Sequence, residues 1–345
     1  MVDTMKTIAQ CSVLACMTFA LALLASSSAR ALVPVNPNAS PEAAELLRFI
    51  DSLSGKYTLS GQHNYPGDLS IHTERAKNIT GSYPVVWGQD FGFTASGQDG
   101  IDNRQKVIDE AIRQHKKGAI ITLMWHAVRP IDDEPDGWKE SVQNDLTDAQ
   151  WQELVTPGTE LHNRWLGQID VVAEFMKKLR DHHVPVLWRP YHEMNGGWFW
   201  WGDKRGEDGY VALWKAMYDR YVNHHELNNV LWVWNPNAPR GNMGPYHAYF
   251  PGLQYVDILA ADVYGNDYKQ SHHDDLLELA GGKPIALGEC GRLPTPEILA
   301  KQPQWTWFMC WTDFLVNQNE PDAVRQLYQT ERVLTLDPVR AMRGE

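Results

Sequence analysis

The chain has 345 residues, of which 43% are hydrophobic and 21% charged, so it can bury a large core and is not a disordered protein. Its formal net charge of -12 argues against nucleic acid and anionic membranes as partners, because binding to phosphates needs an excess of Lys and Arg. The 15 Trp residues instead favour a ligand with flat, partly apolar faces, such as a sugar, although many of these rings will simply pack in the core.

The N-terminal segment has the pattern of an export signal. An apolar run at residues 11–25 is too short to span a membrane, and the Ala-Arg-Ala sequence at residues 29–31 matches the small-x-small pattern that signal peptidases cleave. We therefore expect residues 1–31 to be a signal peptide. Residues 32–345 are then one secreted domain, extracellular or periplasmic, with no membrane contact after the signal is removed.

Eight short apolar runs, rich in β-branched and aromatic residues, alternate with segments of helical period. They begin at Thr58, Pro84, Ala119, Pro185, Asn229, Asp257, Pro284 and Trp305. A further helix is predicted at residues 41–53, where Ser40-Pro41 is a typical helix start. Apolar strands that alternate with helices indicate parallel strands buried on both faces, and eight of them predict an α/β fold, a single (β/α)8 TIM barrel. An open doubly wound sheet is the alternative.

Polar residues stand at the ends of all eight runs, which is where (β/α)8 barrels place their active sites. Two of these ends carry a glutamate, Glu193 and Glu289, each flanked by aromatic or small residues and not by other charges. Glycoside hydrolysis needs two carboxyl groups across one scissile bond, so these two residues are the candidate catalytic pair. The long acidic segment at residues 132–158 is expected to be a loop that either shapes a cleft or is a solvated excursion.

Several motifs at these ends resemble glycoside hydrolase family 26, whose best-known members are β-mannanases. The resemblance is carried by RPYHEMNGGWFWWG at residues 189–202, ALGECG at 286–291, ADVYG at 261–265, GQHN at 61–64 and LMWH at 123–126. It implies a retaining barrel hydrolase in which Glu193 is the acid/base and Glu289 the nucleophile.

The same resemblance implies a set of substrate-binding residues, which are His126, Arg189, His192, Trp198, Asp262, Tyr264 and Trp311. In this interpretation Tyr264 hydrogen-bonds the nucleophile, and Trp198 and Trp311 form an aromatic floor on either side of the cleavage point. Arg189 would keep a carboxylate ionised, since it precedes Glu193 by four residues on one strand and points to the same face. Of the adjacent Trp200 and Trp201, we expect only one to face a ligand.

No metal or cofactor is expected. The paired histidines at residues 182/183, 224/225 and 272/273 lie in polar stretches without zinc-binding spacing, and we interpret them as solvated surface. No GxGxxG, P-loop or GxSxG motif is present in the sequence. Two cysteines outside the signal, Cys290 and Cys310, are too few for a disulfide framework and leave their pairing open.

Together these features predict a secreted, retaining endo-β-1,4-mannanase that hydrolyses mannan, glucomannan or galactomannan backbones by double displacement. The polysaccharide is the expected partner, and the enzyme is expected to be a monomer. Alternatives are a β-1,3-xylanase or mixed-linkage β-glucanase of the same family, or a non-hydrolytic carbohydrate-binding barrel.

Overall fold

The eight predicted apolar runs form eight strands of one sheet in the computed structural model, which describes residues 32–344. The strands are β1 (Thr58–His63), β2 (Val86–Asp90), β3 (Ile120–Trp125), β4 (Val186–Pro190), β5 (Val230–Trp234), β6 (Ile258–Val263), β7 (Ile285–Cys290) and β8 (Trp305–Cys310). Each pairs in parallel with the next, and β1 pairs with both β2 and β8, so the sheet closes. The (β/α)8 barrel is confirmed and the open sheet is wrong. The predicted signal peptide lies outside the described residues.

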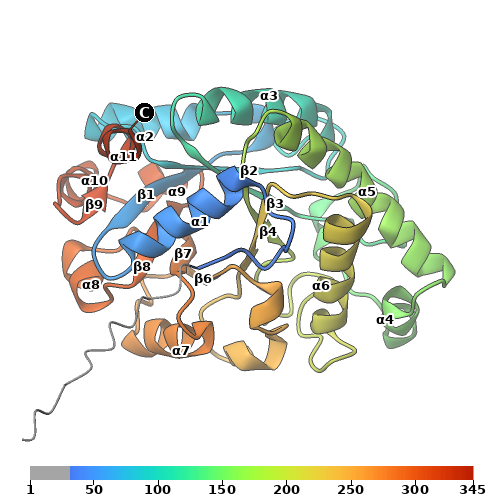
Figure 1. The fold of residues 1–345 in the computed structure, drawn as a ribbon. Coiled ribbons are helices and arrows are strands. Elements are labelled where there is room, and N and C mark those ends of the chain that lie inside the picture. The colour runs from blue at the N-terminus through green and yellow to red at the C-terminus, as the bar shows by residue number, and fades with distance from the viewer. Residues whose placement is uncertain (1–31, 345) are drawn as a thin grey trace, which may run out of the picture. The chain divides into compact units, whose positions relative to one another are not determined.

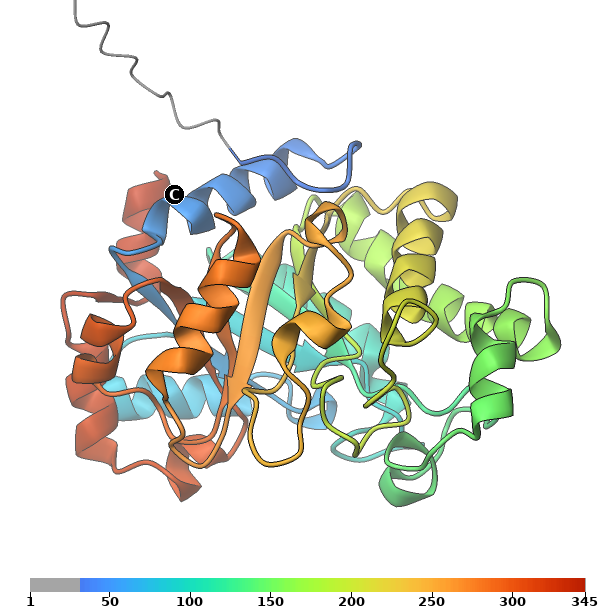
Figure 2. The ribbon, with the colours of Figure 1, turned by 90° about the horizontal axis from the view of Figure 1, so that it is seen from below.

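Helices surround the barrel on its outer face, and a short strand β9 (Val333–Leu334) extends the sheet beside β1 (Figures 1 and 2). The helices are α2 (Ile71–Thr80), α3 (Arg104–His115), α4 (Asp148–Val155), α5 (Glu160–Asp181), α6 (Tyr210–Asp219), α7 (Gln270–Ala280), α8 (Pro296–Lys301), α9 (Phe314–Asn317), α10 (Pro321–Tyr328) and α11 (Leu336–Arg343). The predicted apolar face of α5, which includes Trp165, Ile169 and Val172, is fully buried against the barrel. The helical period of the sequence therefore identifies the faces that cover the strands.

Helix α1 (Pro41–Leu53) closes the N-terminal end of the barrel. Its start is the predicted one, because the Ser40 side chain accepts a hydrogen bond from the Ala43 N–H and Pro41 occupies the first turn. Its buried residues Leu46 and Ile50 belong to the same hydrophobic cluster as side chains of all eight barrel strands. With this end plugged by apolar side chains, the polar residues lie at the opposite, C-terminal end.

The segment at residues 132–158 contains more regular structure than a loop. A π-helical turn η3 (Trp138–Val142) is followed by α4, whose N-terminus is a capping box between Thr147 and Gln150. Trp151 and Leu154 of α4 are buried, three residues apart on one helical face. The prediction of a loop was wrong here because two apolar residues and a cap suffice to fix so short a helix against the barrel.

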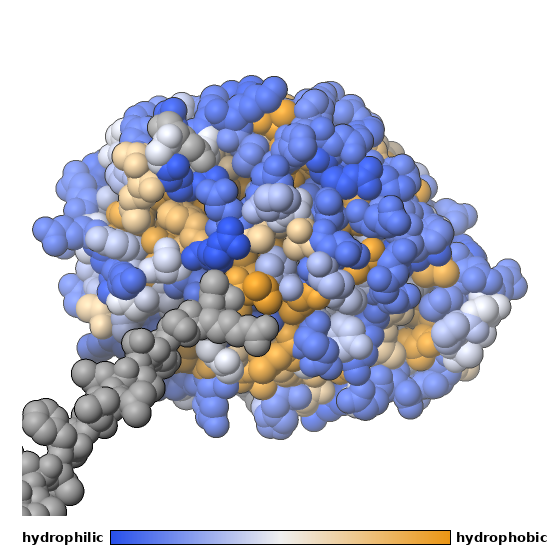
Figure 3. Space-filling view, viewed as in Figure 1, coloured by the Kyte–Doolittle hydropathy of each residue, from blue (hydrophilic) through white to orange (hydrophobic). Residues whose placement is uncertain are grey.

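Large hydrophobic side chains are exposed at a few positions of residues 32–344. Those exposed are Val33, Tyr57, Ile71, Val171, Leu253, Val316 and Met342. On the face of Figure 3 most of the surface is hydrophilic, and hydrophobic residues gather mainly near its centre. Within residues 32–344, no helix combines the length and the apolar character needed to cross a bilayer.

Candidate active site

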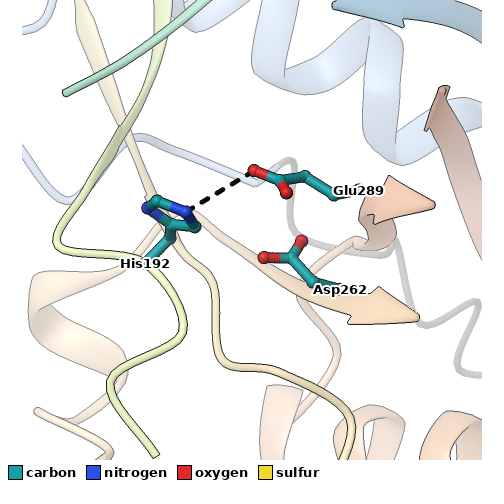
Figure 4. A group of neighbouring side chains, drawn as sticks. All are labelled: His192, Asp262 and Glu289. Atoms are coloured by element: carbon teal, nitrogen blue, oxygen red, sulfur yellow. Dashed lines mark ion pairs between the residues drawn. The ribbon is translucent and has the colours of Figure 1, made fainter. Parts of the chain in front are cut away.

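Three carboxyl groups lie at the C-terminal end of the barrel. Glu289 is in β7, Asp262 is its register neighbour on β6, and Glu193 lies in the turn after β4. His192 Nε2 is 3.7 Å from Glu289 Oε1. One side-chain atom from each of His192, Asp262 and Glu289 that could bind a metal ion, an imidazole nitrogen or a carboxylate oxygen, lies within 4.8 Å of the other two (Figure 4). All four residues are less than a tenth exposed. The structure thus brings both predicted glutamates to one end of the barrel.

Glu289 is held by a cation and a phenol. Arg189 Nη2 donates to Glu289 Oε1 at 2.8 Å, and the Tyr264 hydroxyl donates to Oε2 at 2.6 Å. The other arm of the guanidinium, Arg189 Nη1, donates to Asn235 Oδ1 at 2.6 Å. Asn235 can lie there because residue 288 is glycine: a Cβ on Gly288 would be 1.8 Å from Asn235 Oδ1. The buried carboxylate is therefore paired with a permanent, rigidly held positive charge.

Glu193 lies in a strained turn and not on a strand. Strand β4 ends at Pro190, and Tyr191 and Glu193 have φ angles of 48° and 55°, a region that residues other than glycine seldom occupy. The Glu193 N–H donates to Asn235 O at 2.7 Å, which ties the turn to the end of β5. Arg189 and Glu193 both reach the site, but the argument that they share a strand face is wrong, because the chain leaves the strand between them.

The Glu193 carboxyl is surrounded by neutral donors. Trp198 Nε1 donates to Oε2 at 2.8 Å, and Asn237 Nδ2 donates to Oε1. Gly196 makes room for the indole, since a Cβ there would be 2.2 Å from the Trp198 ring. Burial, followed by the negative charge of Glu289, raises the pKa of Glu193 to about 7, against the opposing effect of the two donors. Glu193 can therefore hold a proton near neutral pH.

Asp262 is fully buried behind the glutamates. Its Oδ1 lies 3.6 Å from Arg189 Nη1, and neither carboxyl oxygen has a hydrogen-bond partner among the described residues. Burial, followed by the charge of Glu289, raises the pKa of Asp262 well above its ordinary value, which favours the neutral acid. His192, Asp262 and Glu289 have the donor atoms of a metal site, but the Arg189 guanidinium already supplies the positive charge there and would repel a metal cation.

Two histidines of opposite charge preference lie beside the glutamates. His126, after β3, bonds through Nδ1 to the Asp90 carboxylate, and its ring is 4.9 Å from that of His192. Burial lowers the pKa of His126, but the Asp90 carboxylate outweighs it and the net shift is upward. Burial, helped by the charges of His126 and Arg189, holds the pKa of His192 well below its usual range. The protonated form is therefore favoured at His126 and the neutral form at His192.

Aromatic rings border the carboxyl groups. Of the 15 Trp residues only Trp138, Trp198 and Trp311 are incompletely buried, and all three are at this end of the barrel. The Trp311 ring is 4.3 Å from that of His63, and the Trp138 ring is 5.0 Å from that of His126. These partly exposed faces are the surfaces on which a flat ligand can stack.

Three residues of the site were not selected from the sequence. Asn237 lies two residues beyond the end of the fifth apolar run, where the pattern already reads as a loop. Trp138 lies in the segment expected to be an acidic loop, and Asp90 is the last residue of β2, one of the polar strand ends to which the sequence gives no specific role. Asp90 and Asn237 have one sequence signal, a position at or just after the end of a strand. This signal is weaker evidence for a functional site than the glutamate pair, because amides and single carboxylates are frequent in loops.

Two other predictions were wrong, the first of them in part. Among the paired histidines, His182, His183 and His224 are exposed as predicted, but His225, His272 and His273 are buried. His272, for example, has its two ring nitrogens 2.9 Å and 3.1 Å from the carbonyl oxygens of Asp267 and Pro239. Trp200 and Trp201 are both fully buried, with their indole N–H groups donating to backbone carbonyls, so neither presents a face to a ligand. Cys290 and Cys310 are free, buried register neighbours.

A (β/α)8 barrel with a pair of carboxyl groups in contrasting surroundings at the C-terminal ends of its strands is the arrangement of a barrel glycoside hydrolase. The profile of glycosyl hydrolase family 26 matches residues 35–338. The chain belongs to this family.

Known proteins similar to this chain cover most of its length. It is 35% identical over 316 residues to a mannan endo-1,4-beta-mannosidase of Thermothelomyces thermophilus, a match that covers 88% of this chain and 63% of the relative, so the chain spans less than two thirds of that protein. A mannan endo-1,4-beta-mannosidase of Bacillus subtilis is 30% identical, with 92% of this chain and 94% of the relative covered. The structure of GH26A from Muricauda sp. MAR_2010_75 matches with a TM-score of 0.85 and 49% identity, covering 88% of this chain and 98% of that one.

Proposed function

We propose that this protein is a secreted, retaining endo-β-1,4-mannanase in which Glu193 is the acid/base and Glu289 the nucleophile. The observation that carries the proposal is the contrast between the two carboxyl groups. One can hold a proton near neutral pH, and the other is paired with a fixed guanidinium. Glycoside hydrolysis requires this division of labour. The names of the Thermothelomyces and Bacillus relatives support mannan as the substrate.

In the first step, the proton of Glu193 passes to the departing glycosidic oxygen while Glu289 attacks the anomeric carbon, giving a glycosyl-enzyme. Arg189 and Tyr264 hold the Glu289 carboxylate through both oxygens, so that it is aimed before substrate arrives. In the second step, Glu193 is the base that deprotonates a water, and this water releases the sugar with its anomeric configuration retained.

Sugar binding is assigned to the groups around the pair. Trp198 and Trp311 would form the stacking floor, and His126 and His192 would contact hydroxyl groups near the cleavage point. The surroundings of His126 favour its charged form more than those of His192 do. Asp262 acts through Arg189 in this scheme, since it is fully buried. The mechanism asks for no metal or cofactor, and residues 1–31 would direct export.

The substrate is tested by measuring reducing-sugar release from glucomannan, galactomannan, β-1,3-xylan and lichenan side by side. We expect turnover on the two mannans, with a rapid fall in the viscosity of galactomannan, because an endo-acting enzyme cuts within the chain. Cleavage of lichenan or xylan alone would assign the chain to another β-glycan. Binding without any turnover, on every polymer, would make it a carbohydrate-binding barrel.

A further inference from the structure

Asn237 lies in a loop, but it is buried and forms a hydrogen bond with Glu193. It lies after β5, is 2% exposed, and its side-chain amide donates to Glu193 Oε1. The other carboxyl oxygen, Oε2, contacts Trp198, which is only partly buried. The two oxygens of Glu193 therefore differ: Oε1 faces a buried amide, and Oε2 faces the partly exposed aromatic residue that borders the opening of the site.

The backbone of Asn237 is clamped on one side by Asn195. Asn195 Oδ1 accepts a hydrogen bond from the Asn237 N–H at 2.8 Å, and Asn195 Nδ2 returns one to the Asn237 carbonyl at 2.8 Å. Asn195 Nδ2 also donates to Gly244 O at 3.2 Å, so the amide is engaged with two loop segments. Asn195 is 1% exposed. Asn195 lies two residues after Glu193. The turn that carries the Glu193 carboxyl group therefore also carries Asn195, which holds the backbone of Asn237 in place.

The other side of Asn237 is fixed by the sheet. Asn237 forms a parallel bridge with Asp262, in which the Asp262 N–H donates to Pro236 O at 3.0 Å and the Ala238 N–H donates to Asp262 O at 2.9 Å. The Asn237 amide therefore has little freedom to follow Glu193 if that side chain rotates. A fixed donor on one oxygen restricts the carboxyl group to one orientation.

We propose that Asn237, held in place by Asn195, is a positioning residue for the acid/base: its amide fixes Oε1 of Glu193 so that Oε2 transfers the proton. The inference rests on the proposed function of Glu193 and deepens it. An N–H on a carboxylate also favours the ionised form, so Asn237 offsets part of the upward shift that burial and Glu289 impose on the pKa of Glu193.

The test compares Asn237→Ala with the wild type on two substrates. On galactomannan, whose leaving group must be protonated, we expect kcat/KM to fall by roughly 10- to 100-fold. On 2,4-dinitrophenyl β-mannobioside, whose leaving group needs no proton, the burst of dinitrophenolate should keep its rate within about twofold, because the attack by Glu289 is unaffected. The alkaline limb of the galactomannan profile should move up by about one pH unit as a donor to the carboxylate is lost.

Further variants separate positioning from folding. Asn195→Ala should shift the profile in the same direction by a smaller amount, and the exposed Asn242→Ala in the same loop is the matched control that should change nothing. If Asn237→Ala does not fold, the isosteric Asn237→Asp replaces it. That variant should approach wild-type rates in acid, where its carboxyl group can still donate, and lose activity as this group ionises.

Equal losses on both substrates, with an unmoved pH profile, would overturn the inference, because they are what a merely structural role produces. Glu193→Gln distinguishes this from failure of the proposed function. If Glu193→Gln retains galactomannan activity, the acid/base assignment itself is wrong. If Glu193→Gln is inactive on galactomannan while Asn237→Ala behaves as the wild type, only the positioning role is wrong.

Discussion

Glu193 and Glu289 are the same chemical group in two very different surroundings. Glu289 is in a regular strand and is held by a guanidinium and a phenol. Glu193 is in a strained turn and is held by an indole and an amide, neither of which carries charge. The carboxyl group with only neutral donors can keep its proton near pH 7. The other carboxyl group forms an ion pair with Arg189.

The surroundings of the two glutamates, and not their residue type, therefore give them different proposed roles. The two carboxyl groups are also coupled electrostatically, because the charge of Glu289 is one of the causes of the raised pKa of Glu193. Changing the surroundings of either glutamate should therefore affect both, in an order that the contacts predict.

The largest effect is expected from removing the proposed nucleophile. Glu289→Ala should lower turnover of galactomannan by at least about 10⁴-fold, since the proposed mechanism forms the glycosyl-enzyme on this carboxylate. Added azide should restore turnover, because the anion can attack the anomeric carbon from the side where the Glu289 carboxylate stood. NMR of the product should show an α-mannosyl azide. A β-mannosyl azide would interchange the roles of the two glutamates, and near-normal activity without azide would refute the assignment. Near-ultraviolet circular dichroism controls for folding.

Removing the cation should be the next most damaging change. Arg189→Met leaves the buried Glu289 carboxylate without its ion pair, so we expect a loss of roughly 3–5 kcal/mol in the free energy of unfolding, together with a large loss of activity. Chemical denaturation measures the first quantity. Arg205→Met, which removes an exposed ion pair to Asp203, is the matched control and should leave the free energy of unfolding almost unchanged, because solvent screens exposed ion pairs. Equal losses for the two variants would contradict the central role given to Arg189.

A smaller effect is expected at the other Glu289 oxygen. Tyr264→Phe removes only the hydroxyl that donates at 2.6 Å, and hydrogen bonds to charged groups contribute about 1.5–3 kcal/mol, so kcat/KM should fall by roughly 10- to 100-fold. Tyr249→Phe is a control, because its hydroxyl contacts Asp203, which is not a residue of this site. A Tyr264→Phe enzyme with unchanged kcat/KM would mean that Arg189 alone positions the carboxylate.

The barrel was predictable because its signal is repeated eight times. Each strand needs several consecutive apolar residues to be buried on both faces, and an α-helix lies between most successive strands, although only 3-10 turns lie between β5 and β6. Single errors in the pattern therefore do not change the fold. Helix α4 escaped detection because it is only eight residues long, with two buried apolar residues and a high content of polar ones. Short helices of this kind depend on tertiary contacts that the local sequence does not reveal.

The site was only partly predictable, since strand ends identify the rim of a barrel but not the contacts across it. Glu193 illustrates this: its chain position relative to the strand pattern indicates the rim, whereas its left-handed turn and its contact with Asn237 depend on where β5 ends. The abundance of Trp was an ambiguous signal for the same reason. It indicated stacking surfaces, yet only Trp138, Trp198 and Trp311 present any. The number of Trp residues in a sequence does not indicate which of their rings are buried in the core.

The smallest and most specific effect is a shift in pH dependence. In the proposed mechanism Glu193 must be protonated to begin the reaction, so kcat/KM should fall as the pH rises through about 7, roughly tenfold per unit above it. The same raised pKa makes the folded state bind this proton more tightly than the unfolded chain. Its contribution to stability is therefore fully present below the ordinary Glu pKa of about 4.3 and lost as the pH rises to about 7.

Glu289→Gln separates the two causes of that raised pKa. It removes the charge of Glu289 but leaves Glu193 buried, so the pKa of Glu193, followed by carbon NMR of its carboxyl group in this inactive variant, should fall while staying above about 4.3. A pKa that does not change would mean that burial alone keeps the proton on Glu193. In that case the two carboxyl groups would be tuned independently, and the reciprocity between their surroundings would be lost.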